Sequence, residues 1–471
     1  MVHEIDADYS QAFVFPQYLD DFVSAGHPAR FIKEFVHSLD IGGLGFVIRE
    51  NTTGRPSYSA RLLLKIWLYG YMHKIRSTRE LERACANDLG MLWLTGMLKP
   101  DHISIWRFFH DNKPLLKDVF RHSVRVASGL GLTSLLVNAI DGTKIVADVK
   151  QKRALHRDDL EKLLLQLSDE AFDRLCDDVE SNEKNDDGSD YALPDDLADR
   201  KKLRDEIKAQ LEKLDESGSA HLNETDEDAR MIKTEHGIKF CYNAQAAVDG
   251  KSGIIVSADV VQDAMDSHLL TDVLEDVKET LGCVAQENLA DSGYFSGDEL
   301  LKAEELGANV LVNLKTTPTF GRSADREYSI PAFTYDAEND NFICPKGGIL
   351  TYRGERRCRN NSQTQKEYSC ASYKDCAFRY ECSKHGRGKT IRISPNREAV
   401  KHQIERQKNA ANASLLNKRK TIVEPVFGYI KHVLGFRRWT VRGIENVRAQ
   451  WALICAAVNL RKMYRIWAIC M

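Results

Sequence analysis

One stretch near the C-terminus constrains this chain more than any other: residues 419–439 read RKTIVEPVFGYIKHVLGFRRW. A single carboxylate, Glu424, stands there among apolar side chains. The helical repeat places three further residues on its face: Phe427, Gly428 and Lys431. Because burying a lone charge costs a large amount of free energy, an acid in such surroundings needs a partner.

Two interpretations of Glu424 follow. It can form a structural ion pair, for which Lys420, one turn earlier, is better placed than Lys431, about 10 Å further along the helix. Alternatively, it can bind a metal ion while Lys431 contacts a phosphate. Pro425 should kink or restart the helix here, because it lacks an N–H group and clashes one turn back. The segment alone favours the ion pair, but two aspartates elsewhere in the chain reverse that preference.

The composition is that of an ordinary soluble globular protein, with 43% apolar and 29% charged residues. A length of 471 residues is enough for roughly two or three hydrophobic cores. The sequence shows neither a signal peptide pattern nor an apolar run of membrane-spanning length. We therefore expect a cytoplasmic protein without a membrane partner, whose 11 cysteines are reduced.

The net charge of −3 conceals two oppositely charged regions. Residues 158–228 contain 25 acids and 9 Lys or Arg, whereas residues 384–448 contain 16 Lys or Arg and 4 acids. A basic region of that density is either a solvated surface or a surface that binds a polyanion, and composition alone does not decide between them. The acidic region is most simply a solvated surface.

The N-terminal part has a helical repeat. The patterns predict helices that start at Ser59 and Ser77, and a third that starts near Asp101. In the third helix, the side chains expected to face inward are Ile103, Ile105, Trp106 and Phe109, and those expected to face outward are Arg107 and His110. Three such helices fit either a helix-turn-helix DNA-binding unit or a small helical bundle without a ligand.

The central part has the repeat of strands. The apolar run 134–140 predicts a buried strand that ends at Asp141, and another short strand is expected to end at Asp291. Alternation over residues 241–261 predicts a hairpin with Asp249 at its turn, where it should take no part in chemistry. An aspartate followed by a turn at a strand end can bind a ligand, although Asp-Gly is also a common turn.

Two further segments differ from their surroundings. Residues 155–216 predict two charged helices, which would form a helical hairpin inserted into the fold. Residues 330–392 are rich in loops and hold five cysteines: Cys344, Cys358, Cys370, Cys376 and Cys382. Their C-x5-C-x5-C spacing departs from the close C-x2-C pairs of typical zinc sites. The segment is therefore either a zinc site or a small subdomain with reduced thiols.

Asp141, Asp291 and Glu424 are far apart in sequence, and spacing alone does not show that they converge. Their chemistry nevertheless suits one class of site. Mg²⁺ prefers oxygen ligands, and two such ions can activate a water and stabilise the leaving oxygen of a phosphodiester. Three convergent carboxylates are the minimum that this chemistry requires.

Four motifs follow one another along the chain: IDGTK at 140–144, YNAQ at 242–245, ADSGY at 290–294 and VEPVFGYIK at 423–431, the last continued by GFRR. Together with residues 54–85, they resemble the DDE transposases of bacterial insertion sequences. The resemblance covers nearly the whole chain and implies a mixed α+β fold. A helical N-terminal DNA-binding domain would occupy 1–130 and an RNase H-like catalytic core 131–471, with an acidic helical insertion at 155–222 and a Cys-rich insertion at 330–392.

The resemblance also implies roles for individual residues. Asp141, Asp291 and Glu424 would hold Mg²⁺ or Mn²⁺, with two ions expected. By the family's E-x6-K spacing Lys431 would contact DNA, and further DNA contacts are expected from Arg437, Arg438, Lys420 and Arg107. The family has Tyr and Arg upstream of the glutamate where this chain has Asn417 and Lys420, and Lys does not offer the bidentate fork of Arg. Independently of the resemblance, the local cluster of soft ligands predicts that a zinc ion would be held by Cys344, Cys370, Cys376 and Cys382.

The function expected from this resemblance is that of a transposase, which binds terminal inverted repeats, cleaves DNA with a metal-activated water and joins the freed 3′-OH to target DNA. Two alternatives stay open: an RNase H-like nuclease without strand transfer, and a catalytically silent DNA-binding descendant. The expected partners are double-stranded DNA and further copies of the chain, in a homodimer or higher multimer. When bound to DNA, the protein would be associated with the nucleoid.

Overall fold

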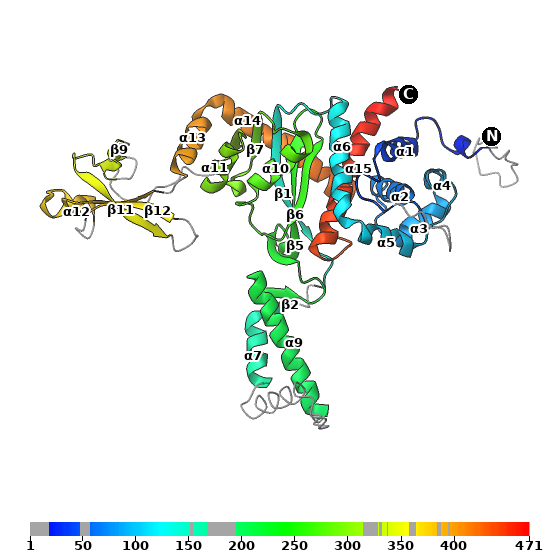
Figure 1. Ribbon diagram of the computed structural model, residues 1–471, viewed down its shortest axis with the longest axis horizontal. Helices are drawn as coiled ribbons and strands as arrows, with labels where there is room; N and C mark the ends of the chain where they lie inside the picture. Colours follow the sequence, from blue (N-terminus) through cyan, green and yellow to red (C-terminus); the bar gives the residue numbers. More distant parts are fainter. Residues whose placement is uncertain are drawn as a thin grey trace, which may run out of the picture.

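The computed structural model describes residues 18–47, 57–150, 154–167, 195–313, 328, 332–336, 338–357, 364–383, 388–393 and 396–470. The molecule is elongated. A central body carries a group of N-terminal helices on one side and a separate small sheet on the other, and a pair of helices projects from it (Figure 1). This mixed α+β organisation confirms the expected fold class at that level. Within the described ranges, none of the helices combines the length and the apolar character that a membrane crossing needs.

The N-terminal group is helical, and its described elements are η1 (Leu19–Phe22), α1 (Pro28–Ser38), α2 (Ala60–Met72), α3 (Thr78–Asn87), α4 (Leu89–Thr95), α5 (His102–Asp111) and α6 (Lys113–Gly129). Capping side chains explain two of the helix starts. Ser59 Oγ accepts a hydrogen bond from Leu62 N (3.2 Å), and Asp101 Oδ1 accepts one from Ser104 N (2.6 Å). Helices α2 and α5 therefore begin where the sequence predicts, and α3 also begins after the predicted Ser77, although the Ser77 side chain makes no capping hydrogen bond.

The inner face of α5 is narrower than predicted. Ile105 and Phe109 are buried as expected, together with Phe108, but Ile103 is 51% exposed and Trp106 37% exposed. The buried residues follow the i, i+3, i+4 pattern of a single stripe, and the two exposed ones lie on either side of it. The prediction that Ile103 and Trp106 face the core is therefore wrong.

The central sheet contains β1 (Val137–Val146), β4 (Arg230–Thr234), β5 (Gly237–Asp249), β6 (Ile255–Val261), β7 (Glu287–Ala290) and β8 (Val310–Val312). β5 pairs antiparallel with β1 along one edge and with β4 and β6 along the other. β7 and β8 continue the sheet from β1 in parallel orientation. The hairpin predicted over residues 241–261 is confirmed by the pairing of β5 with β6.

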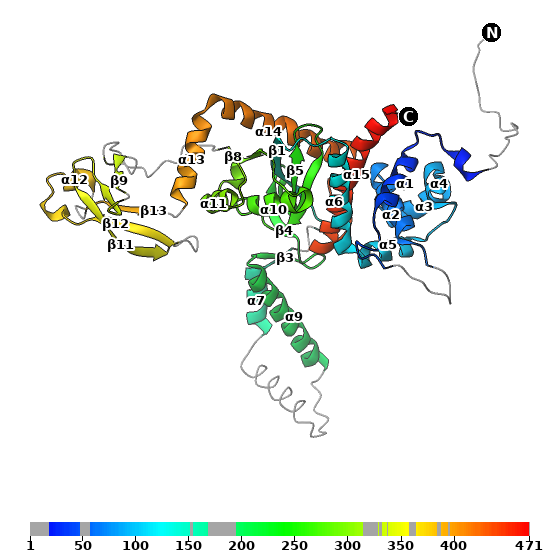
Figure 2. The same cartoon turned by 45° about the horizontal axis from the view of Figure 1, so that its top comes forward.

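The helices of the central body are α10 (Leu270–Leu281), η3 (Ser292–Tyr294), α11 (Gly297–Glu305), α13 (Arg397–Lys408), α14 (Ala410–Gly428), the π-helical turn η7 (Tyr429–Val433) and α15 (Ile444–Cys470). α10 packs against β5 and β6, whereas α14 packs against β1 and β7 and crosses the sheet (Figure 2). α15 packs against α2, α6 and β6, and so attaches the N-terminal helices to the central body.

The projecting pair consists of α7 (Arg157–Leu167) and α9 (Asp195–Ser217), which leave the central body beside two short strands, β2 (Ala154–His156) and β3 (His221–Asn223). The pair has a small core of its own, formed by Leu160, Ile207, Leu214 and Leu222. Both predicted charged helices are thus present in the described part of the segment. Residues 168–194 lie outside the described residues.

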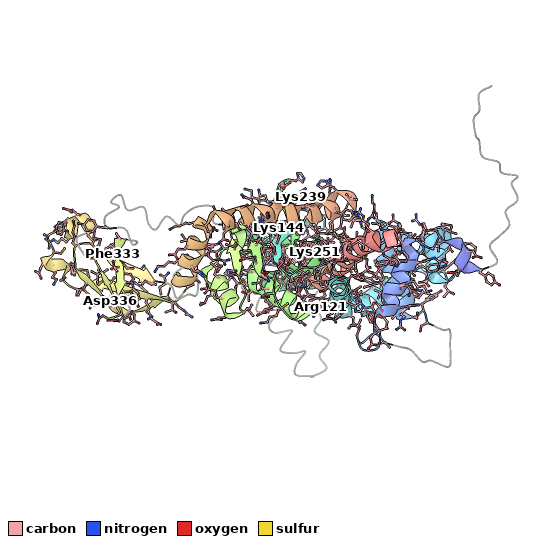
Figure 3. All side chains as sticks on the ribbon, turned by 90° about the horizontal axis from the view of Figure 1, so that it is seen from above. Arg121, Lys144, Lys239, Lys251, Phe333 and Asp336 are labelled. Atoms are coloured by element: carbon pink, nitrogen blue, oxygen red, sulfur yellow. The ribbon has the colours of Figure 1, made fainter. Side chains whose placement is uncertain are left out.

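The Cys-rich segment contains more strand than the sequence suggested. Its described elements are β9 (Thr334–Asp336), β10 (Asn341–Ile343), β11 (Ile349–Arg357), β12 (Thr364–Cys370), η6 (Tyr373–Asp375), α12 (Arg379–Cys382) and β13 (Thr390–Ile393). The strands form one antiparallel sheet in the order β13-β12-β11-β10-β9. This sheet stands apart from the central body, as the positions of Phe333 and Asp336 relative to Lys144 and Lys251 show (Figure 3).

Candidate active site

Asp141 and Asp291 directly follow the last paired residues of the parallel strands β1 and β7. The register of β1 and β7 ends with Ile140 opposite Ala290, so the next residue of each strand is one of the two aspartates. β1 continues beyond this point, paired with β5 as far as Val146, and Asp141 therefore lies inside a strand rather than at its end as predicted. Asp291 does follow the end of β7, as predicted. The two side chains are 24% and 34% exposed.

Arg419, on α14, joins the two aspartates. Its Nη1 lies 2.8 Å from Asp141 Oδ2 and its Nη2 lies 3.5 Å from Asp291 Oδ1, while its side chain is only 7% exposed. Burial raises the pKa of Asp141 above its ordinary value; the positive charge of Arg419 opposes this shift, and the negative charge of Asp291 adds to it. Two carboxylates in this arrangement form a site for a positive charge, which the chain's own arginine occupies.

Lys431 lies in the π-helical turn that follows α14, where it is partly buried, and burial lowers the pKa of its amino group. The negative charges of Glu235 and Asp141 oppose that shift, which places Asp141 within electrostatic range of the lysine. Lys431 is therefore a positive charge that interacts electrostatically with Asp141.

Glu424 does not join the two aspartates in a metal-holding group among the described residues. Glu424 is exposed and, in the part of the chain that the structure describes, it makes neither a hydrogen bond nor an ion pair, so the predicted ion pair with Lys420 does not form. The inward stripe of α14 consists of other residues: Arg419, Val423, Val426, Phe427 and Ile430. Glu424 lies beside this stripe while Phe427 lies on it, so the predicted common face of Glu424, Phe427 and Lys431 is wrong.

Pro425 does not interrupt the helix. α14 continues through it to Gly428, and the irregular part comes afterwards, in the π-helical turn Tyr429–Val433. A π turn adds one residue to the local repeat and commonly occurs at functional sites. Lys431 is therefore rotated from the position that a regular helix would give it, which is a second reason why it does not share a face with Glu424.

The donor set fits a divalent cation in part. Asp141 and Asp291 offer the carboxylate oxygens that Mg²⁺ and Mn²⁺ prefer, and their shared contact with Arg419 shows that a positive charge is stable between them. Among the described residues, however, no group of three His, Cys, Asp or Glu side chains is placed so that it could hold a metal ion. Among the described residues, Glu424 therefore does not complete a three-carboxylate group with the two aspartates, and its role as a ligand stays a prediction.

A polar network lies behind Asp141, on the opposite face of β1. The register places Gly142 opposite Gln245 and Lys144 opposite Asn243. Because side chains alternate between the two faces of a sheet, these four residues lie on the face opposite to that of Asp141. Asp266, in the loop between β6 and α10, gathers three donors at its Oδ1 atom: Asn243 Nδ2 (2.6 Å), Gln245 Nε2 (2.9 Å) and Lys144 Nζ (3.2 Å). The motif YNAQ therefore supports the site from behind.

The same network reaches the loop of Asp291. The Tyr294 hydroxyl, at the end of the short turn that begins after Asp291, donates to Gln245 Oε1. Burial raises the pKa of Tyr294 well above its ordinary value, and the charge of Asp266 raises it further. The hydroxyl therefore stays protonated and acts as a donor, which ties the Asp291 loop to the strand next to Asp141.

The arginines of the GFRR motif are exposed but held in different ways. Arg437 contacts its own turn, with Nε donating to Lys431 O (3.2 Å) and Nη2 lying 2.7 Å from His432 Nδ1. Arg438 contacts the chain beyond β1, with Nη2 donating to Val149 O (2.9 Å) and lying 3.3 Å from Asp148 Oδ1. Arg437 is therefore the freer of the two to meet a ligand.

The other two basic residues expected to contact DNA lie in separate parts of the molecule. Lys420 is exposed on α14, and Arg107 is exposed on α5. The two parts are linked at the GFRR motif, because Arg76, which follows α2, donates from Nη1 to Gly435 O (3.0 Å) and from Nη2 to Leu434 O. The structure thus connects the helical group to the turn that follows Lys431.

Four cysteines line one cavity of about 280 Å³ in the small sheet: Cys344, Cys370, Cys376 and Cys382. All four are free thiols. Burial raises the pKa of Cys382, Lys389 opposes the shift, and the other three thiols add to it. Within the described residues, the four thiols are not arranged as a group that could hold a metal ion. Zinc binding therefore stays a prediction. Cys358 lies outside the described residues.

Two family models match separate segments of the chain. One, a transposase DDE domain, matches residues 343–464, which include α14 and Lys431. The other, a transposase domain (DUF772), matches residues 17–111, which include the helices from α1 to α5. Together the two matches support a DDE transposase of insertion-sequence type. The resemblance inferred from the sequence motifs is thereby confirmed.

Both aspartates of this transposase lie between the two matched segments, so their assignment depends on the motifs and on the geometry described above. A search of curated proteins finds no match. A transposase DDE domain indicates, at a general level, an enzyme that acts on DNA and belongs to a family using divalent metals.

Proposed function

We propose that this transposase binds the terminal inverted repeats of its own element, cleaves the DNA there and joins the freed 3′-OH to target DNA. The observation that supports this most directly is the pairing of Asp141 with Asp291 around a buried positive charge. Two carboxylates on adjacent strands, with Lys431 in electrostatic range, provide a place for a cation next to a place for a phosphate.

The topology supports an RNase H-like core. The strands β6, β5 and β1 are antiparallel neighbours, and β7 and β8 extend the sheet from β1 in parallel, with α14 packed across β1 and β7. As part of this proposal, residues 1–130 form the DNA-binding domain and residues 131–471 the catalytic domain, with residues 155–222 and 330–392 as insertions. The separate sheet and the projecting helix pair agree with that division.

The residues have distinct tasks in the proposed reaction. Asp141 and Asp291 hold the divalent metal, and Glu424, whose exposed carboxylate has no partner among the described residues, serves as the third ligand by resemblance. A divalent metal, when bound, supplies an activated water and neutralises the leaving oxygen. Lys431 binds the phosphate beside the scissile bond, and the network of Asp266 fixes the strand and the loop that carry the two aspartates.

DNA contacts are proposed for two surfaces. The first comprises the N-terminal helices with Arg107, and the second comprises Lys420, Arg437 and Arg438. The hydrogen bonds of Arg76 to the turn at residues 434–435 support a fixed placement of the first surface relative to the second. One duplex could then be held by the helices and presented to the aspartates at the same time. A homodimer or higher multimer would bring two such ends together.

The first prediction tests the metal ligands. Asp141→Asn keeps the shape of the side chain but removes the charge that holds a divalent cation. Because DNA binding depends on Lys and Arg contacts with phosphates, the variant should still shift a labelled duplex that carries the end of the element in a gel. Cleavage of that duplex in Mg²⁺ should fall by at least about a thousandfold, since the transition state loses its main source of charge neutralisation.

Asp291→Asn should behave in the same way, and Glu424→Gln tests the third ligand separately. Asp272→Asn is the matched control, because Asp272 is an exposed aspartate on α10. The Asp272→Asn protein should cleave DNA at the wild-type rate. Near wild-type cleavage by Asp141→Asn would overturn the assignment of the site. Formation of joined products with a target duplex distinguishes a transposase from a nuclease that only cuts.

A further inference from the structure

The guanidinium of Arg419 is placed where the bound cation would be needed. Each of its two terminal nitrogens faces a different aspartate, at 2.8 Å from Asp141 and 3.5 Å from Asp291. Neither carboxylate therefore receives the bidentate pair of hydrogen bonds that makes Arg–carboxylate contacts strong. Arg419 neutralises both aspartates, but its contact with each one is weaker than a bidentate arginine–carboxylate contact.

This position creates a competition. A divalent cation and a guanidinium cannot both take the place between Asp141 and Asp291, because both are positive and both require the same oxygens. Removing the guanidinium without a replacement would leave two partly buried carboxylates facing each other, which is costly. The cation can therefore enter at low cost only if the charge of Arg419 finds another negative partner.

The surroundings of Arg419 show where that partner would come from. Lys418 and Lys420, its neighbours on α14, are both exposed. A DNA phosphate attracted to these lysines would lie next to the position of Arg419 on α14. A phosphate, like a carboxylate, can accept two hydrogen bonds from one guanidinium. The exchange of two single contacts for one bidentate contact favours movement of the guanidinium toward DNA.

We propose that Arg419 is a positioning residue that reserves the cation site: it neutralises Asp141 and Asp291 until a DNA phosphate draws its guanidinium away, so that DNA and the divalent metal bind cooperatively. The inference rests on the proposed function, because it takes the two aspartates as metal ligands. By linkage, the factor by which DNA tightens metal binding equals the factor by which the metal tightens DNA binding.

Two equilibrium measurements test this on the full chain, neither of which requires catalysis. Electron paramagnetic resonance gives the affinity of the free protein for Mn²⁺. Fluorescence anisotropy gives the affinity for a labelled duplex with and without Mn²⁺, at constant ionic strength. In the wild-type chain Mn²⁺ should tighten DNA binding by about fivefold or more, which is the range of ordinary coupling. Arg419→Gln should bind Mn²⁺ about tenfold more tightly without DNA, and the coupling should fall to about one.

Arg419→Lys provides a second variant for the case that the glutamine variant is unstable. It keeps a positive charge but cannot reach both carboxylates with separate nitrogens, so its Mn²⁺ affinity should fall between those of the other two chains. Arg406→Gln is the matched control. Arg406 is also a poorly exposed arginine on a helix, with Nη2 3.0 Å from Glu287 Oε2, and its loss should leave both Mn²⁺ affinity and coupling unchanged.

The outcomes separate this inference from the proposed function. If Asp141→Asn does not abolish Mn²⁺ binding, the two aspartates are not the metal site, and both proposals fail. If Asp141→Asn abolishes binding but neither Arg419 variant tightens it, the metal site stands and the role of Arg419 is refuted. Tightening accompanied by unchanged coupling to DNA would also refute the role, because the proposed exchange requires both effects.

Discussion

Individual residues of the site tolerate very little extra volume. Gly142 directly follows Asp141, and a Cβ there would lie 2.5 Å from Gln245 Nε2 and 3.0 Å from Asp266 Oδ1. Gly428, at the end of α14, has helical φ and ψ, and a Cβ there would meet no atom within 4 Å. The same substitution should therefore have opposite effects at the two positions.

Gly142→Ala should destabilise the chain by about 1–3 kcal/mol, because the network behind Asp141 would have to move. Gly428→Ala should stabilise it by up to about 1 kcal/mol, because alanine loses less backbone entropy in a helix. Urea unfolding of both variants measures the two effects. A Gly142→Ala variant as stable as the wild type would mean that the network has more room than the structure shows.

Residue patterns found the aspartates but not their partners. Asp141 and Asp291 are visible in the sequence because each follows an apolar run and precedes residues that are typical of turns, although β1 in fact continues beyond Asp141. Arg419 is not, because it stands in the basic run Lys418–Lys420, where nothing in the sequence marks which cation turns inward. The burial of Arg419 follows from the register of α14 on the sheet, and that register is a tertiary property. Asp266 lies in a loop, where no repeat gives a direction to a side chain.

For Asp249, the sequence led us to underestimate the structural importance of the side chain. The sequence suggested a turn residue without further importance, but Asp249 is fully buried. Its Oδ2 accepts hydrogen bonds from Ser134 N (3.0 Å) and Leu135 N (2.9 Å), and its Oδ1 accepts one from Lys251 N (2.9 Å). A carboxylate that satisfies three backbone donors anchors the start of β1, so Asp249 is unsuitable as a neutral control for the active-site variants.

At the scale of elements, α15 carries a partly buried lysine that should give the fold a pH dependence. Lys462 Nζ donates to Gly253 O, and burial lowers its pKa from 10.5 to about 8. The folded chain therefore releases this proton at lower pH than the unfolded chain. Stability should rise by about 1–3 kcal/mol as the pH increases from about 8 toward 10.5, because in that window the unfolded state binds more protons.

Lys462→Met should remove that rise, since methionine carries no proton to release. Urea unfolding at pH 7.5 and pH 10 measures the difference for each chain. Lys251→Met is the control, because Lys251 Nζ also donates to a backbone carbonyl, that of Gly131 at 2.6 Å, but is exposed. An equal rise in the Lys462→Met variant would assign the pH dependence to other groups.

The small sheet of β9 to β13 has few buried side chains to stabilise it. Its core consists of Phe333, Phe342, Leu350, Tyr368 and Ile391. Small units with so little core are commonly stabilised by a metal or by disulfides, and the four cysteines around the cavity are free thiols. These observations are the reason to keep the zinc prediction, although the thiols do not form a metal-holding group in the described residues.

Protein purified without chelator should contain about one zinc per chain, and Co²⁺ in its place should give thiolate charge-transfer absorption. Cys382→Ser should lose that absorption, whereas Cys283→Ser should keep it, because Cys283 is an exposed thiol outside the sheet. Absence of metal, together with a fold that chelator does not affect, would leave a subdomain of reduced cysteines.

The starts of helices were easier to predict from the sequence than the length of β1 or the path of α14 through Pro425. Helix starts at Ser59 and Asp101 could be located because a cap requires particular side chains at a particular place. Strand β1 was predicted too short, because the run after Asp141 is polar on the face of Lys144 and gives no apolar alternation. The continuation of α14 through Pro425 depends on packing of its inward stripe, which no local pattern encodes.

At the scale of the whole molecule, the opposite charges of two regions are separated in space. The acidic helix pair projects from one side of the central body, and α14, in the basic region, lies on the other side (Figure 1). A duplex should therefore approach the side of α14. Its affinity should fall steeply with salt, because contacts with phosphates release counterions.

Arg437→Ala should flatten the slope of log affinity against log salt by about one unit, as expected for the loss of one phosphate contact. Arg438→Ala should change the slope less, because Arg438 is already engaged with Val149 O and Asp148. Fluorescence anisotropy over a range of salt concentrations measures both slopes. An unchanged slope for Arg437→Ala would place that residue outside the DNA interface.

The position of α13 has a consequence for how the transposase behaves in a crowded solution. β8 is the last strand of the central sheet, and its outer carbonyls would be open to pairing with another chain. Three side chains of α13 occupy them: Gln403 and Gln407 donate to Val312 O, and Arg406 donates to Val310 O. A strand edge covered in this way cannot recruit a foreign strand, so the helix protects the sheet from aggregation while the Cys-rich sheet extends from the same edge.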